Sequence, residues 1–417
     1  MRGVYYMKKI ISCLLVVMIL CSLVLMLFAC DSNELKKLTY IDENGNEITI
    51  NIQKTSDVDE VSKSLLALGE KNVDRTNLNS LLFTFACDSS VEGIQDGQPF
   101  NYYLNGYSEF GISVSKNVEM DTFMKFLEDV DLYLKMDIDG NVPKNLLFEV
   151  EDEEGENDEG KVNFLISKPC NAHFTTFYND YVFYAKGTFS DMLTQKAKKY
   201  YTGVEKIKDN YGYLAIGAGI ALLEKLINMD NATAIMKEVR SSDSYINTVI
   251  KILQIEEKLE KSEEDNNKSI KAALYPQVKE CVRAFNVQII KTKGSKFTIS
   301  FNINRTAIAY MGTLIPQTAA FFEKFDGNSY FELTMDAKNM IDATLTYDIS
   351  DLVTFFATRN GTNDNVQFTS VRATGTSTLS SNVDIPRISN DEIANAKEIK
   401  LLEMSGLITK AAQIIYS

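Results

Sequence analysis

The chain has 417 residues, of which 45% are hydrophobic and 24% are charged, with 21 glycines and only 6 prolines. This composition is that of a folded protein, and it excludes a largely disordered or a collagen-like chain. The formal net charge is −14, without a local cluster of lysine and arginine. We therefore expect no nucleic-acid partner, because an acidic chain repels phosphate backbones. The length favours either two lobes or one large sheet with insertions.

The N-terminal segment has the pattern of an export signal. Lys8 and Lys9 precede an apolar run over residues 10–28, and the polar residues 31–34 follow soon after it. A basic start, an apolar core and a small residue near the end are typical of a secretory signal peptide. We therefore expect the rest of the chain to lie outside the cytoplasmic membrane.

The end of this run resembles the lipobox of bacterial lipoproteins. Leu27 and Ala29 match the motif ahead of Cys30, whereas Phe28 departs from the residue most common at its place. The resemblance implies a signal peptide at residues 1–29, a diacylglycerol thioether on Cys30 and a short tether at residues 30–37. It also implies attachment to the extracytoplasmic face of the bacterial cell membrane.

An uncleaved signal anchor remains as the alternative. The apolar run approaches the roughly 20 residues that span a bilayer. Both interpretations place the chain beyond residue 30 on the same side of the membrane, because Lys8 and Lys9 hold the N-terminus inside.

The remaining cysteines do not form a disulfide framework in sequence. Three of the six cysteines precede the mature chain or begin it, and the other three are Cys87, Cys170 and Cys281. Three cysteines cannot all pair, and their spacing matches neither a CxxC motif nor a zinc site. We expect most of them to be small buried residues, with one disulfide left open.

Residues 38–187 are predicted to be rich in sheet. Asn44-Gly45 marks the turn of a hairpin over residues 38–52, and Ser56-Asp57 caps a helix that begins near Val58. Phe83 and Phe85 alternate with polar residues, which indicates a half-buried antiparallel strand. Further strands are expected around residues 102–114, 132–138, 146–150, 162–166 and 174–184, with a helix near residues 121–130.

Residues 188–280 are predicted to be helical. Leu214, Leu222 and Leu226 recur at helical spacing in an apolar stretch, and a second helix is expected near residues 246–253. Gly212, Gly217 and Gly219 do not make a nucleotide-binding fingerprint, because the third glycine and the flanking elements are wrong.

Residues 281–417 return to sheet. Phe297 and Phe301 alternate with polar residues, and a helix over residues 307–325 precedes a hairpin at residues 330–349. A Thr/Ser-rich strand at residues 371–381 and a terminal helix capped by Ser389 complete the chain. The fold class expected from this order is α+β, with large curved antiparallel sheets packed against helices and a helical middle segment.

This layout resembles the convex-sheet lipoproteins and lipid carriers of the LolA/LppX type. The resemblance rests on the lipobox-like residues, the strand order and the hairpin at residues 330–349 that precedes strands at residues 368–383. It implies acyl-chain binding between helices and sheet, and no motif is specific enough to transfer a site. A dry cavity is accordingly expected between the inward aromatic side chains, and its candidate residues are Phe83, Phe85, Phe297 and Phe301.

No residue pattern points to catalysis, to a metal or to a cofactor. His173 is the single histidine of the chain, and it lies in a strand-like aromatic stretch where a structural role is expected. The acidic residues 151–159 do not match the order of ligands in a calcium loop, so we expect a solvated loop there.

Two function classes follow. The first is a non-catalytic surface lipoprotein that binds an apolar or lipid-like molecule, with the membrane as its partner through Cys30. The second is an envelope lipoprotein that contacts another protein or a glycan through an exposed aromatic patch. A transporter-linked solute receptor is disfavoured, because it needs parallel strands in two lobes and the hairpins here are antiparallel.

Overall fold

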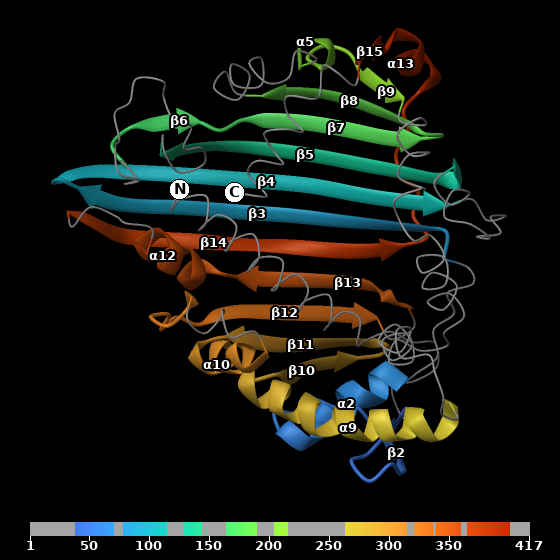
Figure 1. Cartoon of the computed structure of the whole chain (residues 1–417). Helices are drawn as coiled ribbons and strands as arrows, with labels where there is room; N and C mark the ends of the chain where they lie inside the picture. Colours follow the sequence, from blue (N-terminus) through green and yellow to red (C-terminus); the bar gives the residue numbers. More distant parts are fainter. Residues whose placement is uncertain are drawn as a thin grey trace.

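The computed structural model describes residues 38–70, 78–114, 128–143, 164–189, 204–215, 263–314, 321–336, 339–359 and 365–400. These residues form a mixed α and β structure that consists mostly of strands (Figure 1). The α+β class expected from the sequence is therefore confirmed at this level. The curvature of the sheet is not, since neither sheet is strongly curled.

One sheet of 13 strands dominates the molecule. Every neighbouring pair in it is antiparallel except β9 and β15, which are parallel. Its strands lie in the order β10 (Gln288–Lys293), β11 (Lys296–Ile303), β12 (Ser329–Asp336), β13 (Asn339–Asp348), β14 (Val366–Ser381), β3 (Ser80–Gln95), β4 (Gln98–Val114), β5 (Val130–Pro143), β7 (Ala172–Asn179), β8 (Val182–Phe189), β9 (Gly212–Ala215) and β15 (Lys397–Glu398), while β6 (Ser167–Pro169) pairs with β5.

Tight turns join several of these strands. Asp96 and Gly97 link β3 to β4 with φ angles of 53° and 75°, and Asp180 and Tyr181 link β7 to β8 with φ angles of 45° and 60°. Two successive residues with positive φ match the right-handed twist of the flanking strands. The single strand expected over residues 174–184 is therefore wrong, because the chain reverses in the middle of this range.

The hairpin at the start of the described chain is confirmed. Strands β1 (Leu38–Ile41) and β2 (Glu47–Ile50) form the second, two-stranded sheet. The carboxylate of Asp42 accepts hydrogen bonds from the backbone N–H groups of Asn44 and Asn46, at 2.9 and 2.8 Å, and Gly45 has a φ of 81°. An Asx turn and one glycine thus close the loop.

The large sheet has two chemically different faces. Along β3, Leu81, Phe83 and Phe85 point to one face, which we call the apolar face, and the alternate residues point to the other, the polar face. On the polar face the hydroxyl groups of Thr84 and Thr378 meet at 2.5 Å across β3 and β14. The Thr/Ser-rich strand expected near residue 371 is therefore confirmed as β14.

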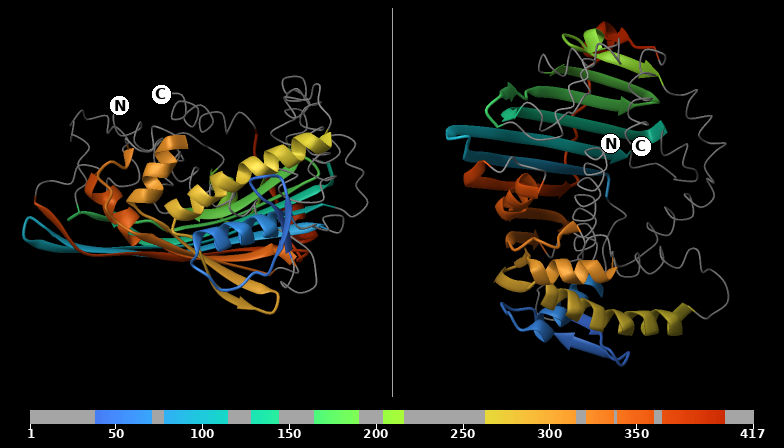
Figure 2. Two further views of the ribbon diagram at one scale, coloured as in Figure 1. Left: turned by 90° about the horizontal axis from the view of Figure 1, so that it is seen from below. Right: turned by 60° about the vertical axis from the view of Figure 1, so that its left-hand side comes forward.

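Among the described residues, four helices lie on the apolar face at one end of the sheet: α2 (Val58–Glu70), α9 (Glu263–Ala284), α10 (Arg305–Leu314) and α12 (Ser350–Arg359). Figure 2 shows α9, α10 and α12 on one side of the strands. Helices α2 and α9 cover Phe297 and neighbouring residues of β11 to β13, and α10 and α12 cover Phe301 and Phe331. Two dry clusters under helices thus make up the core of this end.

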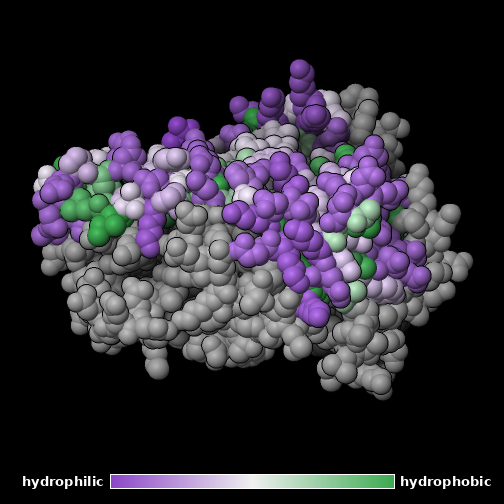
Figure 3. Space-filling model, turned by 90° about the horizontal axis from the view of Figure 1, so that it is seen from above, coloured by the Kyte–Doolittle hydropathy of each residue, from purple (hydrophilic) through white to green (hydrophobic). Residues whose placement is uncertain are grey.

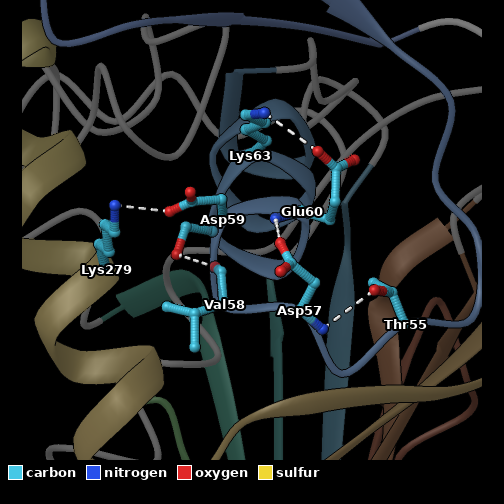
Figure 4. Close-up of polar contacts among 8 residues, drawn as sticks. Thr55, Asp57, Val58, Asp59, Glu60, Lys63 and Lys279 are labelled. Carbon is cyan, nitrogen blue, oxygen red and sulfur yellow. Dashed lines mark hydrogen bonds and ion pairs between the residues drawn. The ribbon is translucent and has the colours of Figure 1, made fainter.

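Helix α2 is fixed at its start and against α9 (Figure 4). The carboxylate of Asp57 accepts a hydrogen bond from the backbone N–H of Glu60 at 2.9 Å, so the predicted cap is confirmed. Lys279 of α9 forms an ion pair with Asp59 at 2.6 Å. The two helices therefore meet through charges as well as through apolar side chains.

A segment after β14 crosses the polar face near the other end of the sheet. Ile385 packs there with Tyr133, Phe177 and Tyr211. The segment continues into α13 (Asn390–Asn395), which Ser389 and Glu392 close with a capping box, as expected. Viewed from this end, where α5 (Val204–Ile207) and β15 lie, the described surface is predominantly hydrophilic (Figure 3).

Several predicted elements differ from the structure. Leu214 lies in strand β9 and pairs with Phe183, so the apolar helix expected to include Leu214 is wrong at its start. Residues 164–166 form a turn where a strand was expected, and Val130 begins β5 where a helix was expected to end. Within the expected helical middle, the described residues include α5 and the part of α9 up to residue 280. Residues 216–262 of this segment, the strand expected at residues 146–150 and the acidic residues 151–159 lie outside the described residues.

Candidate functional site

The candidate site is the part of the apolar face that lies beyond the four helices. One row of side chains crosses the sheet on this face, because residues opposite each other in an antiparallel pair share a face. Its members, from the helix-covered end to the other, are Phe297, Met335, Ala343, Leu379, Phe83, Phe110 and Leu134. The apolar surface is therefore continuous from the covered strands to β5.

Burial changes along this row. Phe297 and Met335 are fully buried under α2 and α9, Phe83 is half-buried, and Phe110 on β4 is 44% exposed. Phe183 on β8 points to the same face and is 40% exposed. Two phenylalanines are thus accessible on a face that is otherwise used for packing, which is an unfavourable exposure of apolar area.

The four predicted cleft residues share the apolar face and lie in two pairs on separate strands. Phe297 and Phe301 lie on β11, and Phe301 stacks on Phe331 with ring centroids 4.9 Å apart. Phe83 and Phe85 lie on β3, and Phe85 stacks on Tyr347 at 6.0 Å. Since β12, β13 and β14 separate the two pairs, about 19 Å lies between them.

Phe110 and Phe183 were missed by the sequence analysis. A signal for Phe110 was present, because it alternates with polar residues in a stretch that was predicted to be a strand. Its place opposite Phe83 follows from the pairing of β3 with β4. Cys30, the predicted lipidation site, lies outside the described residues.

Small residues occupy the middle of the apolar face. Gly375 and Gly106 flank Cys87 on the two neighbouring strands. The ring of Tyr347 lies against Gly375, where a Cβ atom would clash with it, and its hydroxyl group donates a hydrogen bond to the carbonyl of Ala86 at 3.3 Å. Burial raises the pKa of the Tyr347 hydroxyl and of the Cys87 thiol. Both groups are therefore protonated at neutral pH, and this surface is suited to contact rather than to nucleophilic chemistry.

The three cysteines of the described residues are free thiols. Burial raises the pKa of Cys281 to about 11 and also raises that of Cys170. The disulfide left open by the sequence is therefore absent among Cys87, Cys170 and Cys281.

His173 belongs to a small charged group on the polar face. Its Nδ1 atom lies 3.1 Å from a carboxylate oxygen of Asp137, and Lys135 binds the other oxygen at 2.9 Å. Lys135 and, to a lesser degree, His173 lower the pKa of Asp137. Thr188 of β8 lies directly opposite His173 on this face.

A second polar group lies beside it. The hydroxyl groups of Tyr107 and Tyr133 donate hydrogen bonds to the two oxygens of Glu109, at 2.5 and 2.6 Å. The hydrogen bond to Glu109 raises the pKa of Tyr107 to about 12. In the part of the chain that the structure describes, no group of three or more His, Cys, Asp or Glu side chains is placed to hold a metal ion.

The described helices include none that is long and apolar enough to cross a membrane. No family model matches the chain, and the comparison with curated proteins found no match. The candidate site is therefore assigned from its own residues, which combine a continuous apolar row, two exposed phenylalanines and protonated, unreactive neighbours.

Proposed function

We propose that the chain is an exported, lipid-anchored bacterial surface protein that binds an apolar or lipid-like molecule without catalysis. The observation that carries the proposal is the exposure of Phe110 and Phe183 on the apolar face. The lipobox-like residues that end in Cys30 support the location. A protein tethered to a membrane is close to lipid acyl chains, which are apolar and could therefore cover the exposed phenylalanines.

The energetics favour an apolar ligand. Complete burial of one phenylalanine side chain contributes about 2–3 kcal/mol. Coverage of Phe110 and Phe183 together with the half-buried Phe83 and Phe85 would therefore supply much of the free energy of binding. A sheet that bends around its ligand, as the lipid-carrier resemblance implies, is part of the same proposal.

Native mass spectrometry of residues 31–417, purified from a bacterial host, tests the ligand. We expect an adduct in the lipid mass range that denaturing conditions release. Phe110→Ser should reduce the adduct and also the saturable binding of a polarity-sensitive dye. Tyr107→Ser is the matched control, because Tyr107 is an exposed aromatic residue of the same strand on the opposite face. A clean apo mass together with no saturable dye site would overturn the proposal.

The anchor has its own test. Cys30→Ser in the full chain should abolish the lipid-modified mass and release the protein from the membrane fraction. Unchanged processing, mass and membrane attachment would contradict lipidation at Cys30 and would favour the uncleaved signal anchor.

A second candidate function is contact with another component of the cell envelope, through a protein or a glycan. Tyr103 and Tyr107 favour it, because both are exposed on the polar face at 43% and 37%. This function does not require the apolar site, since the two tyrosines lie on the opposite side of the sheet.

A further inference from the structure

The polar face carries an arrangement that the apolar ligand does not explain. Tyr103 and Tyr107 lie four residues apart on β4, and residues at even spacing along a strand share a face. Their positions are about 13 Å apart along the strand. Both tyrosines are exposed, although an aromatic residue of a central strand is normally buried. The sheet therefore presents two separate aromatic rings on its solvent side.

Hydrogen-bonding side chains fill the space between the two rings. Asn105 lies midway on β4, with Asp88 of β3 and Asp139 of β5 directly opposite on either side. All three side chains are exposed. The surface thus alternates an aromatic ring, a row of carboxylate and amide groups and a second aromatic ring.

Tyr107 is held in a defined position. Its hydroxyl group donates to Glu109, which also accepts from Tyr133, and the ammonium group of Lys135 lies 5.7 Å from the ring centroid. Ala86, opposite Tyr107 on β3, is too small to cover the ring. A ring fixed in this way loses little conformational entropy when it binds a ligand.

Charge and polarity restrict the partner. Asp88, Asp137, Asp139 and Glu109 outnumber the cations Lys135 and Arg372 of this surface, in a chain of net charge −14, so an anionic polymer is repelled. A protein partner is disfavoured, because charged residues are depleted from the centre of protein interfaces and here they occupy it. The remaining class is a ligand with many hydroxyl groups, flat apolar faces and no acid groups.

We propose that the surface formed by Tyr103, Asn105 and Tyr107 with Asp88 and Asp139 is a binding site for a glycan of neutral or amino sugars. The C–H faces of the sugar rings stack on the two tyrosines, and the sugar hydroxyl or amino groups donate to the carboxylates and to the Asn105 carbonyl oxygen. The proposal gives the second candidate function its partner class and is independent of the apolar ligand.

Isothermal titration calorimetry on residues 31–417 tests the site with three soluble probes: chitotetraose, cellotetraose and tetragalacturonate. We expect saturable binding of at least one of the first two and none of the acidic third. Tyr103→Ala and Tyr107→Ala should each weaken binding about tenfold, because tyrosines are frequent anchors of binding surfaces.

Tyr330→Ala is the matched control. Tyr330 is 38% exposed on the same face and donates a hydrogen bond to Glu332 at 2.7 Å, as Tyr107 does to Glu109, and it lies on the distant strand β12. Phe110→Ser should also leave glycan binding unchanged, which separates this proposal from that of an apolar ligand. The proposal is overturned if neither neutral probe binds, if tetragalacturonate binds more tightly, or if both tyrosine variants bind as well as the control.

Discussion

Gly111 of β4 lies directly beneath Ile385, and a Cβ atom at position 111 would stand 2.7 Å from Cγ2 of Ile385. Ile385 belongs to the segment that crosses the polar face, where it packs on Tyr133 and Phe177. The missing side chain at position 111 therefore lets this segment approach the sheet closely enough to exclude water.

The contact predicts a coupled pair of mutations. Ile385→Ala should lower the free energy of unfolding by about 2–5 kcal/mol, because a buried branched side chain is lost. Gly111→Ala should lower it by about 1–3 kcal/mol through overpacking. In the double variant the clash disappears, so the combined loss should be smaller than the sum. Urea denaturation of the wild type, the two single variants and the double variant measures these free energies. Strictly additive losses would contradict the contact between Gly111 and Ile385.

The two ion pairs between α2 and α9 should differ in their contributions. Lys271 binds Glu70 at 2.7 Å with both side chains largely buried, whereas Lys279 binds Asp59 at 2.6 Å with side chains that are 35% and 48% exposed. Lys271→Met should lower the free energy of unfolding by about 1–3 kcal/mol, because it leaves a poorly solvated carboxylate. Lys279→Met, the matched control, should cost less than about 1 kcal/mol. If urea denaturation gives equal losses of unfolding free energy for the two variants, burial does not determine the contribution of the Lys271–Glu70 pair.

The tyrosines bound to Glu109 predict a loss of stability at high pH. The pKa of Tyr107 is raised to about 12 and that of Tyr133 is raised as well, the latter chiefly by burial. The native state therefore holds these protons more tightly than the unfolded state. Their stabilising contribution is complete below about pH 10, the ordinary pKa of tyrosine, and is lost as the pH rises toward 12.

Urea midpoints measured from about pH 9 to 11 check this direction. Glu109→Gln should make the decline shallower, because the neutral amide no longer disfavours the two phenolates. An equal slope in both proteins would rule out Glu109 as the cause.

The thiols should react in a fixed order. Burial raises the pKa of Cys281 to about 11, and Cys281 packs against the core under α10 and α12. We expect it to be alkylated far more slowly than Cys87 and Cys170 near pH 8 and to react fully after denaturation. Mass spectrometry of residues 31–417 after treatment with iodoacetamide gives the order of alkylation. A disulfide between two of the three cysteines, or alkylation of Cys281 as fast as that of the other two, would contradict the prediction.

Local features of the fold were predictable from the sequence, because short stretches of chain encode them. Strict alternation located β11 around Phe297, Asp57 and Ser389 marked helix starts through their side-chain oxygens, and Asn44-Gly45 marked a turn. Each of these signals acts within a few residues, so tertiary packing did not override it.

The lateral order of the strands was not predictable, and the site depends on it. The alternation of apolar and polar residues placed Phe83 and Phe297 on inward faces. No short stretch of the sequence, however, indicates that three strands separate them in the sheet. Leu214 matched a helical spacing, yet its pairing with Phe183 places it in a strand. Exposure of Phe110 is set by where the helices end on the sheet, which is a property of the whole fold.

The pairing of β14 with β3 has a consequence for how the chain folds. Thr84 and Thr378 touch across this seam although they are 294 residues apart in sequence. During synthesis, one edge of β3 stays without its partner until nearly the entire chain has emerged. Such a non-local sheet folds slowly and exposes unpaired backbone to aggregation in the meantime. We therefore expect efficient production to depend on chaperones that hold the chain until β14 is available.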